Sequence, residues 1–279
     1  MKILSFDIEE WFHFDICSTE DKWINYSPRI NLFLPQILDV LEAKNIKATF
    51  FCLGWIARTY PDIIRRIHEK GHEIGCHTDK HLFIHEMKPI DFDTDLKKAL
   101  FSLENIIGEK IKSFRAPSFT ITEESKWAFE ILAKNGIEND CSIFPTSRSY
   151  GGFPSYDATT PAFIEYDGIK IKEFPISTGK IMGKRIVYTG GGYFRLFPYW
   201  FIKTMLSQSD YAMSYFHMRD FDYEQPRFSY LTLERKFKSY FGLKSSYSKF
   251  MKLLDDFEWI NVQSASDKID WDEVKTIRL

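Results

Sequence analysis

The sequence predicts an α/β fold in which a parallel sheet or barrel forms the core. Short apolar runs alternate four times with longer segments of helical periodicity before residue 140, and this order is typical of parallel strand–helix units. A length of 279 residues with 44% hydrophobic residues suits one large core that needs no disulfide support. We therefore expect a single domain over residues 1–279.

Most of the first elements carry a start or stop signal. Ser27 and Pro28 form an N-cap followed by proline at the first helical position, and the apolar residues after them repeat with helical spacing. Pro61 opens a second helix, which Gly71 ends, and Gly108 ends a third helix that begins near residue 91. Buried strands are expected at residues 2–7, 47–53, 73–76, 112–115 and 137–140, with a fourth helix at 122–135.

The alternation breaks at residues 144–161, a stretch rich in Pro, Gly, Ser and Tyr. Beyond it, Asp167 and Gly168 separate strands at 163–166 and 169–174, and this dipeptide is a strong hairpin signal. Residues 189–195 are expected to form a glycine-rich turn, and they lack the ending of a phosphate loop. We therefore expect an inserted hairpin and loop region near 144–195, then helices at 196–206 and 247–257 and strands at 211–216 and 259–262.

Composition and charge argue against several classes of protein. The formal net charge of −2 does not favour nucleic acid as a partner, and no apolar run is long enough to span a bilayer. The N-terminus lacks the apolar segment of a signal peptide, so a cytoplasmic protein is expected. The basic segment 235–252 is either a solvated helix face or a contact with the inner membrane surface or an anionic polymer. The cysteines, which lack Cys-x-x-Cys spacing and are expected to be reduced core residues, are Cys17, Cys52, Cys76 and Cys141.

Polar residues follow the predicted strands at the points where the strands end. Because the carboxyl ends of parallel strands meet at one edge of a sheet or barrel, we expect these side chains to converge there. They are Asp7, Glu9, His77, His81, Arg115, Asp140 and His217.

Two pairs among these residues have spacings that suit a metal site. His77 and His81 are four residues apart, which would place both imidazoles on one face of a helical turn, where a carboxylate could complete a two-His, one-carboxylate set. Asp7 and Glu9 are two residues apart at a strand end, so both point to the same side, and one could bind a metal while the other acts as a base. The alternatives are a surface histidine pair, and solvated loop acids or a helix N-cap.

Arg115 precedes Ala116 and Pro117, and the proline favours an extended turn whose backbone N–H groups point in a fixed direction. Arg115 therefore holds either a carboxylate of the site or a structural salt bridge, and the turn can bind an oxyanion. His217 is either a catalytic group or a hydrogen-bonded structural histidine. A zincin, a zinc deaminase and a serine-nucleophile elbow are excluded because their motifs are absent.

In this order, these residues resemble the motifs of the polysaccharide deacetylases of carbohydrate esterase family four, the NodB-homology group. The resemblance extends over nearly the whole chain and is carried by Ser5–Glu10, Gly71–His81, Phe114–Ser118, Asp140–Ser142 and Tyr215–His217. Two later segments, Gly190–Arg195 and Phe221–Arg227, resemble a subgroup associated with surface-polysaccharide biosynthesis.

The resemblance implies a distorted (β/α) barrel and a metal-dependent hydrolase. Its expected substrate is an amino sugar of a polysaccharide, an oligosaccharide or a precursor, from which it would remove an N-acetyl or O-acetyl group. The resemblance also implies a divalent metal ion, zinc in preference to others, held by Glu9, His77 and His81.

The resemblance assigns the remaining roles as well. Asp7 would remove a proton from water, and Arg115 would keep Asp7 ionised. The backbone N–H of Ser118 would support the oxyanion. His217, oriented by Asp140, would protonate the leaving amine.

The chain departs from the family pattern at two positions. The usual first motif has adjacent aspartates, whereas here Ile8 separates Asp7 from Glu9, and Glu10 is an alternative metal ligand. Ser118 stands where an aromatic residue is usual, which preserves a backbone N–H donor but puts a stacking wall in doubt. Two other functions stay open: an amide hydrolase acting on a small molecule or a lipid-linked sugar, and a catalytically inactive carbohydrate-binding homologue.

Overall fold

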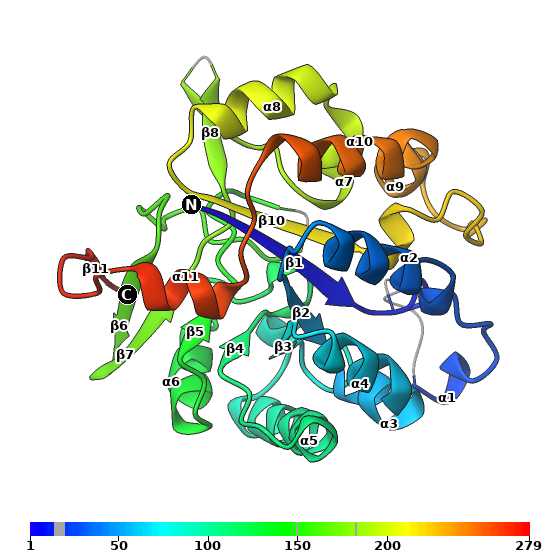
Figure 1. Ribbon diagram of the computed structural model, residues 1–279. Helices are drawn as coiled ribbons and strands as arrows, with labels where there is room; N and C mark the ends of the chain where they lie inside the picture. The colour runs from blue at the N-terminus through cyan, green and yellow to red at the C-terminus, as the bar shows by residue number, and fades with distance from the viewer. Residues whose placement is uncertain (14–19, 149, 182) are drawn as a thin grey trace.

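The computed structural model describes residues 1–13, 20–148, 150–181 and 183–279, and a nine-stranded sheet forms its centre (Figure 1). The strands from β10 to β7 are parallel, while β6 runs antiparallel to β7. The expected α/β class with a parallel sheet is therefore confirmed. In spatial order the strands are β10 (Ala212–His217), β1 (Lys2–Ile8), β2 (Thr49–Cys52), β3 (Glu73–Cys76), β4 (Ser113–Phe114), β5 (Asn139–Asp140), β7 (Ile169–Glu173), β6 (Ala162–Tyr166) and β11 (Thr276–Arg278).

The helices pack around the sheet (Figure 1). In α2, apolar residues spaced three and four apart form one buried stripe, as the sequence pattern predicts. Gly108 adopts φ 74° after the third predicted helix, a left-handed conformation that ends the helix at low steric cost. The helices are α1 (Glu20–Trp23), α2 (Ile30–Ala43), α3 (Gly54–Thr59), α4 (Pro61–Glu69), α5 (Pro89–Ile107), α6 (Trp127–Lys134), α7 (Gly191–Leu196), α8 (Tyr199–Ser207), α9 (Leu233–Tyr240), α10 (Leu243–Asp256) and α11 (Val262–Lys268), with 3₁₀ turns η1 (Ile84–Glu86), η2 (Pro117–Phe119) and η3 (Met218–Asp220).

The expected barrel is distorted because its described strands do not close into a complete ring. Hydrogen-bonded neighbours run from β10 to β11, and no pairing between described strands joins these two ends. A separate hairpin, β8 (Thr178–Ile181) and β9 (Lys184–Val187), lies within the region expected to be inserted. The strand expected at 259–262 is reduced to a single bridge between Ile3 and Ile260, because α11 begins at Val262 with Asn261 as its N-cap.

Several element boundaries differ from the sequence expectation because local hydrogen bonds compete with helical periodicity. The glycine-rich segment expected as a turn forms the short helix α7, and α3 was not expected. The fourth predicted helix begins at Trp127 rather than at 122, because Ser125 Oγ accepts a hydrogen bond from the N–H of Thr122 and holds these residues in a turn. Turn chemistry, rather than helical periodicity, therefore sets the start of α6.

Three of the four cysteines lie in the core of the fold. Cys52, Cys76 and Cys141 are buried and form no disulfide bond, as expected of reduced core residues. Cys17 lies outside the described residues. Among the described helices, none combines the length and the apolar character that a bilayer crossing requires.

The buried histidine before β3 leads to a prediction about stability. Burial lowers the pKa of His72 to about 4, with the charges of Lys47 and Lys70 acting in the same direction. Between pH 6.5 and 4 the unfolded chain therefore binds a proton that the folded chain does not, so this group's contribution to stability falls as the pH decreases. The free energy of unfolding lost when the pH has fallen below 4 is up to about 3 kcal/mol.

The measurement is urea unfolding of the native chain and of His72→Asn between pH 7 and pH 4.5. The asparagine carbonyl can still accept the hydrogen bond that Ala48 N–H donates to His72 Nδ1. The native chain should lose more stability than the variant as the pH falls. Parallel curves for the two proteins would contradict the prediction.

Candidate active site

Three buried side chains converge beyond the carboxyl ends of β1 and β3. Glu9 Oε2 lies 2.6 Å from His81 Nε2 and 3.9 Å from His77 Nε2. The three potential ligand atoms lie within 4.8 Å of one another. Two imidazoles and one carboxylate directed at one point form a donor set that suits a divalent metal ion with open coordination positions.

The protonation states of these residues also suit a metal. His77 Nδ1 lies 2.7 Å from the carbonyl of Arg115, a contact that assigns the ring proton to Nδ1 and leaves Nε2 available as a ligand. Burial lowers the pKa of His77 to about 4, so its imidazole is neutral at pH 7. Burial alone would raise the pKa of Glu9, but the charges of His81 and His217 together hold it well below its usual value.

A loop, and not a helical turn, brings the two histidines together. Residues 77–81 are outside any helix, and Thr78 and His81 adopt left-handed backbone conformations with φ 69° and 57°. The N–H of His81 donates to Thr78 Oγ1, which closes the loop on itself. The expectation that a helical turn places the two histidines on one face is therefore wrong. The imidazole rings are nevertheless adjacent, with centroids 5.4 Å apart.

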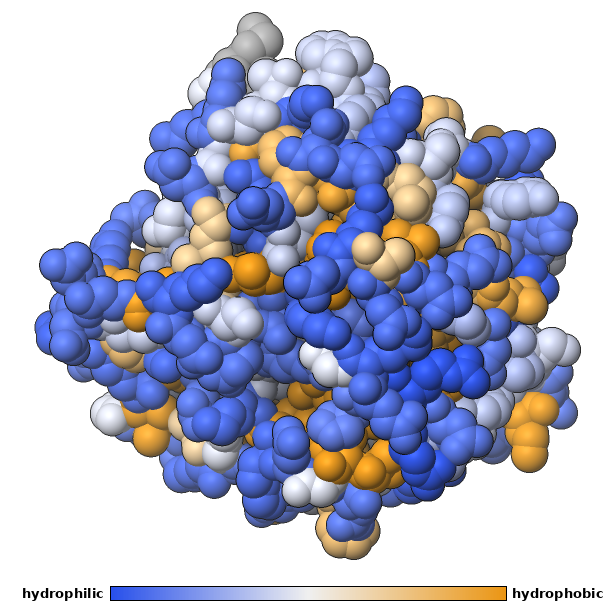
Figure 2. Space-filling model, viewed as in Figure 1, coloured by the Kyte–Doolittle hydropathy of each residue, from blue (hydrophilic) through white to orange (hydrophobic). Residues whose placement is uncertain are grey.

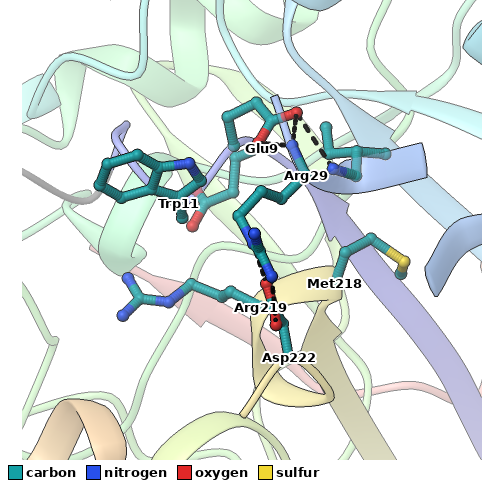
Figure 3. Close-up of a pocket in the computed structure, with 8 residues that line it drawn as sticks. Glu9, Trp11, Arg29, Met218, Arg219 and Asp222 are labelled. Carbon is teal, nitrogen blue, oxygen red and sulfur yellow. Dashed lines mark hydrogen bonds and ion pairs between the residues drawn. The ribbon is translucent and has the colours of Figure 1, made fainter. Parts of the chain in front are cut away.

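The neighbouring acid Glu10 has a different role. Its carboxylate accepts hydrogen bonds from the N–H groups of Arg29 and Ile30, so it caps the first turn of α2 from outside the helix. This cap explains why α2 begins at Ile30 and not at Pro28. Figure 3 shows the pocket beside Glu9, where the Arg29 guanidinium is paired with Asp222. Glu10 is therefore unavailable as the third ligand, and the geometry favours Glu9.

Asp7 lies beside the metal donors and is held by Arg115. Arg115 Nη1 lies 2.7 Å from Asp7 Oδ1, and both side chains are almost completely buried. The guanidinium also lies over the ring of Phe51, with 4.2 Å to the centroid, and its Nε donates to the carbonyl of Cys141. Arg115 thus forms an ion pair within the site, and the interpretation of Asp7 and Glu9 as solvated loop acids is excluded by their burial.

His217, at the end of β10, lies close to both Asp7 and Glu9. Its Nε2 lies 3.6 Å from Asp7 Oδ2 and 3.8 Å from Glu9 Oε1, while its Nδ1 lies 2.9 Å from Asp220 Oδ2. Burial opposes the charged form, but the charge of Glu9 and the hydrogen bond with Asp220 outweigh it and raise the pKa of His217 to about 9. The imidazole is therefore protonated near neutral pH and can donate a proton.

The expectation that Asp140 orients His217 is wrong. Asp140 is completely buried and accepts hydrogen bonds from the Oγ and the N–H of Ser142. Burial raises the pKa of Asp140 and, more strongly, that of Glu173, its partner on the adjacent strand. Asp140 instead stabilises the structure beneath the site, since Ser142 Oγ accepts the N–H of Ala116 in the Arg-Ala-Pro turn.

Sequence reasoning missed Asp220 and the arginine that holds it. Arg195, buried on α7, donates from Nε to Asp220 Oδ1 at 3.0 Å. Its other nitrogens bind the carbonyls of Lys238, Ser239 and Phe241. The signal for Asp220 was its position three residues after His217; for Arg195, it was the end of the glycine-rich segment.

Ser118 lies in a strained turn next to the site. Its backbone adopts φ 51° and that of Phe119 φ 58°, and Arg148 Nη1 donates to the Ser118 carbonyl at 3.0 Å. Arg148 also lies over the ring of Phe119, which packs against Tyr215. The Ser118 N–H belongs to the preceding peptide, whose Pro117 carbonyl accepts hydrogen bonds from the N–H and the Oγ1 of Thr120, and these bonds hold that peptide in one orientation, as an oxyanion donor requires.

Two family matches divide the chain at about its midpoint. Residues 12–138 match the polysaccharide deacetylase family, and residues 141–267 match a domain of unknown function, DUF3473. Residues 12–138, just under half of the chain, are therefore similar to that family. The site draws on both matched segments and on the strand before them, since Asp7 and Glu9 precede residue 12 and His217 belongs to the second segment.

Relatives of this chain are named for amino-sugar deacetylation. A peptidoglycan-N-acetylglucosamine deacetylase of Bacillus cereus is 38% identical over 99 residues, covering 35% of this chain and 36% of that protein. A chitooligosaccharide deacetylase of Azorhizobium caulinodans is 30% identical over 116 residues, covering 41% of this chain and 51% of that protein. The chain thus spans about a third to a half of the length of these relatives.

Solved structures share the fold of this chain. One from Mycobacterium smegmatis, named for polysaccharide deacetylation, superposes with a TM-score of 0.67 at 16% identity, and the match covers 100% of this chain and 92% of that one. A family 4 carbohydrate esterase pseudoenzyme from Bacillus anthracis superposes with a TM-score of 0.52 at 13% identity, covering 100% and 69%. Because this fold occurs in a pseudoenzyme too, function must be argued from the site residues.

The replacement of Asp140 by Asp220 as the partner of His217 leads to a prediction. Asp220→Asn should lower kcat about 10- to 100-fold, because the protonated form of His217 loses its carboxylate partner. The pKa of His217 should then fall, so the alkaline limb of the pH–rate profile should move to lower pH. The measurement is kcat between pH 6 and pH 10 with any acetylated substrate that the native chain turns over.

Asp140→Asn is the matched control. Burial already favours the neutral form of Asp140, and an asparagine resembles that form, so the alkaline limb should stay in place. A shift of the limb in the Asp140 variant but not in the Asp220 variant would reverse the assignment.

Proposed function

We propose that this protein is a metal-dependent hydrolase that removes an N-acetyl or O-acetyl group from an amino sugar. The substrate is a polysaccharide, an oligosaccharide or a precursor of surface polysaccharide. The observation that carries the proposal is the cluster of Glu9, His77 and His81, beside which the base candidate and the acid candidate lie 3.6 Å apart.

The metal ligands in this proposal are Glu9, His77 and His81, and zinc is the preferred ion because of the imidazole donors. When bound, a divalent ion polarises the carbonyl under attack and lowers the pKa of water.

The chain's own residues would divide the proton transfers. Asp7, fixed and charge-balanced by Arg115 at 2.7 Å, accepts a proton from the attacking water. The Ser118 N–H binds the oxygen on which negative charge develops. His217, held by Asp220, donates its proton to the leaving nitrogen as the carbon–nitrogen bond breaks, so the products are acetate and a free amine.

We also propose that residues 1–279 act as one catalytic unit. The candidate base comes from β1 and the candidate acid from β10, and these strands are adjacent, with Asp7 paired to His217 in register. Neither matched segment contains both groups, so neither would be active alone.

The test is acetate release measured with acetylated nucleotide sugars, lipid-linked sugars and oligosaccharides, with metal analysis of the same sample. We expect about one zinc ion per chain, and loss of activity after chelation that zinc restores. Activity on a single small or lipid-linked sugar would narrow the substrate class. A metal-free, stably folded chain that releases no acetate from any of these would favour the inactive carbohydrate-binding homologue instead.

A further inference from the structure

The helix α9 turns an apolar side toward solvent. Leu233, Phe237 and Phe241 follow one another at intervals of four residues, so they lie along one side of the helix and its end. They are 85%, 51% and 46% exposed, and Ser239 is the buried residue of α9. The rings of Phe237 and Phe241 are in contact, with centroids 4.7 Å apart, and form a continuous apolar surface.

An amphipathic helix of a globular protein normally packs its apolar side on the core. α2 does so with a buried stripe that includes Leu34, Leu38 and Leu41. In α9 the arrangement is reversed, although the helix is well formed, with Thr232 Oγ1 accepting the N–H of Arg235 as its N-cap. Hydrophilic residues cover most of the face seen in Figure 2, and apolar colour is confined to separate small groups. An exposed apolar helix side is therefore a feature that needs a partner.

The charge around α9 indicates what kind of surface would cover it. Residues 227–252 contain seven Lys or Arg residues and one acid, Glu234, whereas the whole chain has a formal charge of −2. The cations Lys238 and Lys244 are exposed beside the apolar side. An apolar side of Leu and Phe flanked by cations is the pattern of a helix that lies in the interface of an anionic membrane.

We propose that this protein docks on anionic lipid bilayers through α9. Leu233, Phe237 and Phe241 insert at the boundary between headgroups and acyl chains, and the lysines pair with the headgroups. α9 lies at the periphery of the molecule, beside α10 in Figure 1, so a flat surface can reach it.

The docking helix is joined to the candidate active site by one arginine. Arg195 binds the carbonyls of Lys238, Ser239 and Phe241 at the end of α9, and its Nε binds Asp220, the partner of His217. Docking would therefore hold His217 and Asp220 at a fixed distance and orientation relative to the bilayer. If the proposed deacetylase function holds, that relation suits an amino sugar carried on a membrane lipid.

The test is flotation of the full chain with vesicles of phosphatidylglycerol and phosphatidylcholine, compared with vesicles of phosphatidylcholine alone. We expect binding to the anionic vesicles that weakens as salt is added. Phe237→Ser should weaken it about 10-fold or more, since a large apolar side chain no longer leaves water. Lys244→Glu should also weaken it and flatten its salt dependence.

Phe101→Ser is the matched control, because Phe101 is an aromatic residue 68% exposed on α5. It should bind like the native chain. Absence of binding to anionic vesicles, or equal losses in Phe237→Ser and Phe101→Ser, would overturn the proposal. A dimer that Phe237→Ser disrupts, without vesicle binding, would assign this side of α9 to a second copy of the chain. None of these readouts requires catalysis, so they are independent of the proposed deacetylase function.

Discussion

Asp7→Asn should lower turnover by at least about 10²-fold while the metal stays bound. The substitution removes the basic oxygen but keeps the shape of the side chain, and Glu9, His77 and His81 remain as donors. A positioned general base contributes about 10²- to 10⁴-fold, so kcat should fall by that factor. The measurement pairs the rate of acetate release with metal content determined on the same preparation.

This variant should also be less stable. Arg115 is completely buried, and its partner would become neutral, which leaves a buried charge without compensation at a cost of about 3–5 kcal/mol. Metal content must therefore be measured well below the unfolding temperature of the variant. If metal were lost in a sample that is still folded, Asp7 would belong to the metal ligands and the division between base and ligand would be wrong.

Glu9→Gln should remove both metal and activity, whereas Glu10→Gln should affect neither directly. Glu9 supplies the only carboxylate of the described donor cluster, and an amide carries no charge to balance a divalent ion. Metal affinity should fall by at least about 100-fold, more than is typical for loss of an outer partner. Metal titration of the two purified variants measures the difference.

Glu10→Gln is a close control, because the two residues are adjacent and carry the same side chain. Its expected effect is on folding: the carboxylate cap of α2 becomes neutral, which should lower the free energy of unfolding by about 1–2 kcal/mol. Loss of metal from the Glu10 variant at full folding would make Glu10 a ligand after all.

Much of the site could be predicted because parallel strands align their ends. Asp7, Arg115 and His217 each follow an apolar run, and any parallel arrangement of these runs brings them to one edge. The order of the motifs can be read directly along the sequence, and the family match over residues 12–138 agrees with it.

Other features were not visible because they depend on contacts between distant segments. The choice of Glu9 over Glu10 follows from the start of α2, nearly twenty residues later, which takes up the Glu10 carboxylate. The partner of His217 is Asp220 because a 3₁₀ turn after β10 folds it back onto the imidazole, while Asp140 is engaged by Ser142.

The sequence by itself determined the α/β class, the positions of the main strands along the chain and the residue types at their ends, because apolar periodicity and turn residues act locally. Tertiary structure alone decided which of these side chains touch. His77 and His81 were chosen for a helical spacing that the chain does not adopt, and a loop with two left-handed residues brings them together instead. The apolar side of α9 faces solvent for the same reason: amphipathic spacing shows that a helix has two sides, but only the packing of the rest of the chain decides which side is covered.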